Sequence, residues 1–119
     1  FYVQYAHARI RSIFRQPGAF EPGDGIDLEL LAAPEELGVL KRLARFPWTL
    51  SAIVRSLEPH PLTEYLIDLA RAFHRFYTRH RVIGTDRRTT AARLALCRAV
   101  ADVLAEGLRL MGVSAPERM

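Results

Sequence analysis

The chain contains 119 residues, the usual length of one domain, and half of them are hydrophobic, which is enough for a single core. Its formal net charge of +4 comes almost entirely from arginine, because Lys41 is the only lysine. No run of about 18 apolar residues occurs, which excludes a membrane-spanning helix, and the first residues lack the basic and apolar segments of a signal peptide.

The basic excess and the single cysteine set broad limits on the partners and the compartment. The arginine side chain stacks on bases and forms bidentate hydrogen bonds with phosphates. The composition therefore permits nucleic-acid binding, although it does not establish it. Cys97 is alone and cannot form an intramolecular disulfide, which indicates a reducing compartment. We therefore expect a cytoplasmic protein. The first residue is Phe1 rather than Met, which indicates a fragment or a processed chain.

The first predicted helix spans Phe1–Arg15 and ends near Gln16, before the helix-breaking pair Pro17-Gly18. Helical spacing predicts a buried stripe made of Val3, Ala6, Ile10, Ile13 and Phe14. Tyr2, Tyr5 and Arg9 cluster on another side, with Arg11 and Arg15 beside them. An exposed face of tyrosine and arginine suits stacking on unpaired bases and pairing with phosphates. Half-buried packing of both tyrosines is an alternative that periodicity leaves open.

Residues 17–33 contain two prolines and three glycines and are predicted to form an irregular loop. Its middle, Glu21–Gly25, is expected to be a mobile, solvent-exposed turn. The apolar residues that follow are expected to form a short extended segment that packs on the helices: Ile26, Leu28, Leu30 and Leu31.

Two short helices are predicted next. The first begins at Pro34 with two acidic residues near its positive end, runs to about Phe46, and is expected to bury Leu37, Leu40, Leu43 and Ala44. The second begins at Pro47 and is expected to pack Trp48, Ile53, Val54 and Leu57 inward. The residues Glu58-Pro59-His60-Pro61 predict a rigid turn.

Two long helices complete the predicted bundle. The first, about Pro61 to Val82 and closed by Gly84, has a stripe of Leu62, Tyr65, Leu66, Leu69, Phe73 and Phe76. Tyr77 and Arg81 lie at the margin of that stripe, one turn apart. The second, about Arg87 to Met111 with Thr85 or Asp86 as its cap, is apolar nearly all round, which is typical of a central helix. These patterns predict an all-α fold, an antiparallel bundle of about five helices in one domain, residues 1–119.

Motifs of catalysis are missing from the sequence, which contains no glycine-rich phosphate loop, HExxH, CxxC or GxSxG pattern. The four histidines are too scattered to form a ligand set, and Cys97 is expected to be a packing residue. Arg93 projects near the buried stripe of its helix, so we expect it to bond a carboxylate or carbonyl groups of a neighbouring helix. A stand-alone enzyme is not expected.

Four ordered segments resemble one known family. They are YVQYAHARIRSI at 2–13, EPH at 58–60, FHRFYTRHRVIG at 73–84 and ARLALCRAVADVLAEGLRLMGVSAPERM at 92–119. Together they resemble the C-terminal anticodon-binding (DALR-type) domain of arginyl-tRNA synthetases, which are class I aminoacyl-tRNA synthetases. Residues 17–34 match weakly and resemble a variable insertion. Ala92-Arg93-Leu94 falls where the name-giving motif would lie, without its aspartate. The last segment resembles the family's ending, so we expect Met119 to be the natural carboxyl terminus.

The resemblance implies that the chain binds the anticodon loop of arginine tRNA. The RNA contacts that it implies are Tyr5, Arg9, Tyr77, Arg81 and Met119. Some relatives carry an aromatic residue where this chain has Arg81, so a guanidinium plane or a phosphate contact would replace base stacking there.

The parent enzyme implied by the resemblance joins arginine to its tRNA with ATP and magnesium. Its catalytic domain is absent from this chain, so we expect no cofactor in the fragment and no activity of the fragment alone. The expected partners are arginine tRNA and the upstream catalytic domain, with neither membrane nor DNA. The alternative function is a helical protein-interaction module with no RNA role. A duplex DNA-binding helix pair is less favoured, because the arginines do not concentrate on one short recognition helix.

Overall fold

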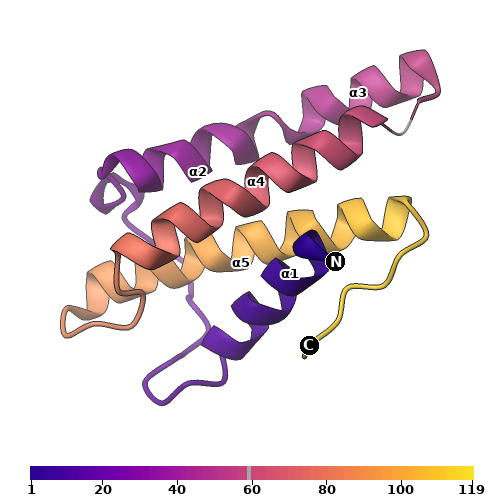
Figure 1. Ribbon diagram of the computed structural model, residues 1–119. Coiled ribbons are helices and arrows are strands. Elements are labelled where there is room, and N and C mark those ends of the chain that lie inside the picture. The colour runs from indigo at the N-terminus through magenta and orange to yellow at the C-terminus, as the bar shows by residue number, and fades with distance from the viewer. Residues whose placement is uncertain (59) are drawn as a thin grey trace.

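The computed structural model describes residues 1–58 and 60–119, and within this part the chain forms five α-helices, one short 3-10 helix and no strand. The elements are α1 (Tyr2–Ile13), η1 (Leu28–Leu30), α2 (Pro34–Ala44), α3 (Phe46–Ser56), α4 (His60–Arg79) and α5 (Arg87–Leu110). In Figure 1, α2 and α3 run antiparallel to α4, α5 runs antiparallel to α4, and α1 crosses α5. The predicted all-α antiparallel bundle is therefore confirmed. None of the helices in the described ranges has the length and apolar character needed to cross a membrane.

The two long helices form the centre of the core, as their periodicity predicts. The stripe of α4 is completely buried: Leu62, Tyr65, Leu66, Leu69, Phe73 and Phe76. The stripe of α5 is buried as well: Leu94, Cys97, Ala101, Leu104 and Leu108. Asp86 caps the start of α5 by accepting a hydrogen bond from the backbone N–H of Arg88. Gly112, just after α5, has a φ of 74°, a left-handed conformation that ends the helix. Leu110 is an exception to the predicted apolar circumference, because 47% of it is exposed.

The buried side of α2 differs from the prediction. Leu37 and Ala44 face solvent, Leu40 and Leu43 are half-buried, and the fully buried residues are Glu36 and Val39. The carboxylate of Glu36 accepts the backbone N–H of Ala33 at 3.1 Å and the Nε–H of Arg93 at 2.9 Å. These two bonds direct the Glu36 side of the helix inward, which a pattern of apolar residues cannot reveal.

Arg93 binds a carboxylate of a neighbouring helix, as the sequence predicts, and also a carbonyl that lies after α4 rather than within a helix. Its Nε binds the Glu36 carboxylate, and its Nη1 donates to the backbone carbonyl of Arg81 at 2.9 Å. One guanidinium therefore joins α5 to the start of α2 and to the segment that follows α4.

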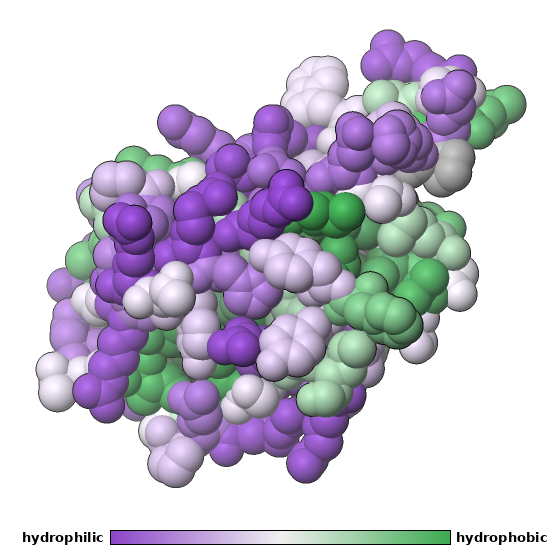
Figure 2. All heavy atoms as spheres, viewed as in Figure 1, coloured by the Kyte–Doolittle hydropathy of each residue, from purple (hydrophilic) through white to green (hydrophobic). Residues whose placement is uncertain are grey.

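The packing predicted for α3 is wrong for three of its four residues. Trp48 and Val54 are each 75% exposed and Leu57 is 86% exposed, whereas Ile53 is half-buried against the core. The helix packs mainly against α4 and less against α2, near the end of the bundle, so among the described residues much of its surface stays exposed. Figure 2 shows apolar residues on the surface at the right-hand end of the molecule, where α3 and α5 end. The predicted turn at 58–61 lies partly outside the described residues.

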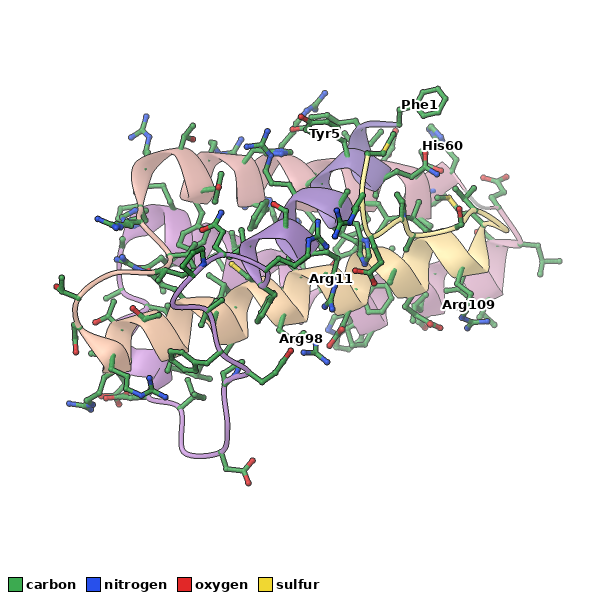
Figure 3. The ribbon with its side chains drawn as sticks, turned by 90° about the horizontal axis from the view of Figure 1, so that it is seen from below. Phe1, Tyr5, Arg11, His60, Arg98 and Arg109 are labelled. Carbon is green, nitrogen blue, oxygen red and sulfur yellow. The ribbon has the colours of Figure 1, made fainter. Side chains whose placement is uncertain are left out.

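The loop between α1 and α2 contains a 3-10 turn rather than the extended segment predicted for residues 26–31. The side chain of Asp27 accepts the backbone N–H of Glu29 and so starts the turn Leu28–Leu30. Leu31 is buried, whereas Leu28 is mostly exposed. An ion pair between Glu21 and Arg98 ties the loop to α5. Figure 3 shows Arg98 beside this loop.

We predict that Glu36→Ala lowers the free energy of unfolding by about 3 kcal/mol, because it removes the charge partner of Arg93 and leaves Nε of Arg93 and the backbone N–H of Ala33 without an acceptor. Urea denaturation of the 119-residue chain measures the change. Glu29→Ala is the control, because Glu29 is exposed and should cost under about 0.5 kcal/mol. Equal losses in the two variants would contradict the buried bridge.

We predict opposite effects for alanine at two helical glycines. A Cβ on Gly38 would meet only the end of the Arg42 side chain, at 3.5 Å, so Gly38→Ala should stabilise α2 by about 0.8 kcal/mol. A Cβ on Gly107 would lie 2.6 Å from the side chain of buried Leu66, so Gly107→Ala should destabilise the fold by about 1 kcal/mol or more. Thermal unfolding of both variants checks the signs.

Candidate nucleic-acid interface

Three segments of the chain meet around one open hollow of about 460 Å³. Its lining comes from α1 and the residues after it, from α4, and from the last two residues of the chain: Tyr5, Ala8, Arg9, Ser12, Arg15, Tyr77, Arg118 and Met119. We call this site the tyrosine–arginine hollow. The chain returns from the end of α5 to α1 in Figure 1, and Figure 3 shows Tyr5 where α1 passes α4.

Arg9 lies between the two tyrosine rings. Its Cζ atom is 5.4 Å from the centroid of Tyr5 and 5.4 Å from the centroid of Tyr77. A guanidinium at this distance from aromatic faces gains cation–π attraction of about 0.5–1 kcal/mol or more per ring. Its Nε atom is covered and has no hydrogen-bond partner within the described residues. The two rings therefore hold the charge of Arg9 in place.

The two tyrosines that line the hollow, Tyr5 and Tyr77, have different surroundings. Tyr77 is half-buried and stacks on the core residue Phe73, with ring centroids 5.8 Å apart. Tyr5 is 47% exposed. Tyr77 thus contributes to packing as well as to the hollow, whereas Tyr5 offers an accessible ring.

A histidine extends the aromatic surface beside the hollow. The ring of His74 is 5.3 Å from that of Tyr2, and its Nδ1 lies 3.1 Å from the Tyr2 hydroxyl. Burial lowers the pKa of His74 below 6.5, and the positive charge of Arg9 lowers it further. The imidazole is therefore mainly neutral at pH 7, and it avoids adding a second charge next to Arg9.

The lining of the hollow carries positive charge, and no acidic side chain contributes to it. Arg9 and Arg118 have no carboxylate within ion-pair distance in the described ranges, and Arg15 is 3.9 Å from Glu117. Several arginines elsewhere are held by closer carboxylates, as where Arg42 binds Asp68 at 2.9 Å. The hollow therefore favours an anionic ligand with flat, stackable groups.

The structure brings four of the five predicted contact residues together and separates one. Tyr5, Arg9, Tyr77 and Met119 share the hollow, whereas Arg81 lines a neighbouring hollow of about 590 Å³ that also includes Tyr77. Helix α4 ends at Arg79, so Arg81 does not continue its stripe.

The side chain of Arg81 instead donates to the carbonyl of Ile83 at 2.8 Å. The prediction missed Arg118, because a basic residue in a non-helical tail carries no periodic signal.

Metal-binding groups and the single cysteine are two further candidate sites of chemistry. Among the described residues, no cluster of three or more His, Cys, Asp or Glu side chains could hold a metal ion. Cys97 is buried in α5, and burial raises the pKa of its thiol to about 12. A thiol with that pKa is not a nucleophile at neutral pH, which agrees with its predicted packing role.

Comparisons with known proteins give one consistent family. The model of the DALR anticodon binding domain family matches residues 3–119. An arginine–tRNA ligase of Geotalea daltonii is 48% identical over the whole of this chain, which corresponds to 22% of that relative. One of Acidithiobacillus ferrooxidans is 45% identical, and the chain corresponds to 21% of it. The chain thus spans about a fifth of the length of these relatives.

Solved structures give the same result. The arginyl-tRNA synthetase of Thermus thermophilus matches 99% of this chain with a TM-score of 0.86 and 33% identity, over 21% of its own length. The arginyl-tRNA synthetase of Plasmodium falciparum matches 99% with a TM-score of 0.78 and 26% identity, also over 21% of its length.

We predict that Arg9→Gln raises the pKa of His74 toward its ordinary value, because it removes the second cause of the lowered pKa while burial remains. The histidine ring signals in an NMR titration measure this pKa. Since the pKa is lowered in the folded state, protonation below pH 6.5 favours the unfolded chain, and Arg9→Gln should weaken that acid destabilisation. Arg71→Gln on the solvent side of α4 is the control, and an equal pKa change there would contradict the role of Arg9.

Proposed function

This chain belongs to the DALR anticodon binding domain family, and on that premise we propose that it binds the anticodon loop of arginine tRNA in the tyrosine–arginine hollow. The observation that carries the proposal is the guanidinium of Arg9 held between the rings of Tyr5 and Tyr77. An ordered stack of this kind provides flat surfaces for bases that have left their own stack.

Base stacking supplies one part of the proposed affinity. Single-stranded bases stack on aromatic side chains with about 1–3 kcal/mol per base, and arginine planes serve the same purpose. Tyr5 is the ring with free surface, and Met119 adds an apolar side chain to the same hollow. We propose Tyr5 and Met119 as base contacts, with Arg9 and Tyr77 as their support.

Phosphate binding supplies the remainder. Arg118 and Arg15 border the hollow, and an RNA loop that places phosphates beside them would release counterions on binding. Arg81, in the neighbouring hollow, is proposed as a contact with the next phosphate or base of the same loop. This part of the affinity should decrease as the salt concentration rises.

We further propose that the parent protein is an arginine–tRNA ligase of the cytoplasm. The relatives named as arginine–tRNA ligases are about five times longer than this chain. Joining arginine to tRNA with ATP and magnesium would be the task of the remaining part of such an enzyme. On this proposal the isolated chain binds tRNA and does not catalyse its aminoacylation.

The exposed apolar residues at α3 favour a protein contact in addition to the RNA site. Trp48 and Val54 lie on different sides of α3, and Leu57 follows directly after it. All three are exposed, and large exposed apolar side chains in one region of a surface are typical of an interface. We propose that the catalytic domain of the parent covers some of these residues. A protein-interaction role without RNA binding is the competing function, and the experiment below separates the two.

We predict that the 119-residue chain binds an arginine tRNA transcript more tightly than a transcript altered only in the anticodon. Tyr5→Ala should weaken binding of the first transcript about 5- to 150-fold, which corresponds to the loss of about 1–3 kcal/mol of stacking. Trp48→Ala is the matched control, because it removes an exposed aromatic residue remote from the hollow. Fluorescence anisotropy at fixed salt measures these affinities.

Equal affinity of the chain for both transcripts would contradict anticodon recognition. Tyr77→Ala is also expected to weaken RNA binding, but because Tyr77 stacks on Phe73 its effect must be compared with the loss of thermal stability. Tyr5→Ala avoids this ambiguity.

A further inference from the structure

The last six residues of the chain form a segment without helix or strand that lies along α1 (Figure 1). We call residues 114–119 the tail. At the end of α5, Gly112 adopts a φ of 74° and the N–H of Val113 donates to the carbonyl of Leu108 at 2.9 Å. This turn sends the chain back toward α1, more than a hundred residues away in sequence.

One polar stripe of α1 and the residues after it bonds the tail at several points. The stripe, which we call the tail-holding stripe, consists of Gln4, His7, Arg11 and Arg15, spaced three or four residues apart on one side of the helix. The first two bind backbone carbonyls, Gln4 that of Ser114 at 3.3 Å and His7 that of Pro116 at 2.8 Å. The stripe lies on another side of the helix than the core stripe and the tyrosine face, and only its last member, Arg15, also lines the hollow.

Glu117 is bound by the two arginines of the stripe. Nε of Arg11 donates to its carboxylate at 3.0 Å, and Nη2 of Arg15 donates to its backbone carbonyl at 3.2 Å. Figure 3 shows Arg11 where the tail passes α1. The hydrogen bond from Arg11 lowers the pKa of the Glu117 carboxyl, with the positive charges of Arg11 and Arg15 contributing, so this carboxylate is ionised at neutral pH.

His7 is the buried member of the stripe. Only 6% of it is exposed, and a carbonyl oxygen can only accept, so Nδ1 must carry the proton that it donates to Pro116. A buried donor without this acceptor would be costly. His7 therefore fixes the course of the tail one residue before Glu117 and two residues before the tail enters the hollow.

The residues after Glu117 are the ones that line the tyrosine–arginine hollow, namely Arg118 and Met119. We propose that His7 and the Glu117-binding arginine Arg11 are positioning residues, which dock the tail so that Arg118 and Met119 form one wall of the RNA-binding hollow. This inference rests on the proposed function. Docking of the tail and affinity for the anticodon loop are accordingly coupled, although neither His7 nor Arg11 lines the hollow.

Methyl NMR of the 119-residue chain tests the docking without RNA. The sequence has two methionines, so methyl-labelled methionine gives separate signals for Met111 and Met119, which Met111→Leu assigns. Met119 shares the hollow with two tyrosine rings, whose ring currents should displace its signal from the position of a free chain. His7→Leu should move the signal toward that position, and His7→Asn, which keeps a donor near the place of Nδ1, should restore it.

Binding of an arginine anticodon stem-loop tests the coupling on the same variants. We expect His7→Leu to weaken binding about tenfold, the effect of one lost hydrogen bond, and His7→Asn to recover most of the affinity. Glu117→Gln is a second variant at an exposed position, where folding is not at risk, and should shift the methyl signal and weaken binding in the same direction.

The two measurements distinguish failure of this inference from failure of the proposed function. A Met119 signal at the free-chain position in the unaltered protein would overturn docking, whatever the RNA affinity. Release of the tail by His7→Leu with no change in RNA affinity would overturn the coupling while RNA binding stands. A docked tail in a chain that does not bind the stem-loop would overturn the proposed function and the coupling together.

Discussion

The buried ion pair between Glu36 and Arg93 is the interaction on which the arrangement of the other elements depends. Glu36 is 1% exposed, and its carboxylate also accepts the N–H of Ala33, so it fixes the start of α2. Arg93 extends the bridge to the carbonyl of Arg81. A pair of this kind contributes little net stability compared with apolar packing, but either partner alone would be a costly buried charge. The ion pair therefore sets how α2, α5 and the segment after α4 are arranged relative to one another. That segment includes Arg81, which lines the neighbouring hollow.

The distribution of arginines explains how a modest net charge becomes a local binding surface. Most arginines around the bundle lie against carboxylates, as where Arg42 and Arg45 share Asp68 and where Arg109 binds Glu106. Their charges are largely neutralised at short range and serve packing. Arg9 is bounded by aromatic rings instead, and Arg118 has no carboxylate partner in the part of the chain that the structure describes. Arg9 and Arg118 thus place part of the positive charge of the chain where α1, α4 and the tail meet.

The sequence predicts the long helices well and the short ones poorly, for a physical reason. In α4 and α5 the apolar residues repeat over many turns, so a single buried face satisfies the pattern and the predicted stripes are confirmed. In α2 and α3 the apolar residues lie on several sides, and polar bonds or missing neighbours decide which side is buried. Glu36 is buried because of its bonds, and Trp48 is exposed because α4 and α2 leave much of the surface of α3 uncovered. Likewise Tyr5 and Arg9 follow from helical spacing, whereas Arg118 depends on a tail contact across more than a hundred residues that local patterns do not encode.

The hollow is built on core residues, and this bears on how tightly it could bind. Phe73 is fully buried, stacks on Tyr77 and contacts His74 edge-on, while Tyr77 and Tyr5 together hold Arg9. The buried ring of Phe73 thus supports Tyr77, and Tyr77 together with Tyr5 supports Arg9 at the surface. A ligand that stacks on such a surface does not have to order the side chains that receive it, and this ordering is one of the main costs of association. The tail is the exception, because its place depends on a few polar bonds to α1, so the wall formed by Arg118 and Met119 is the part of the hollow whose order varies most readily with sequence.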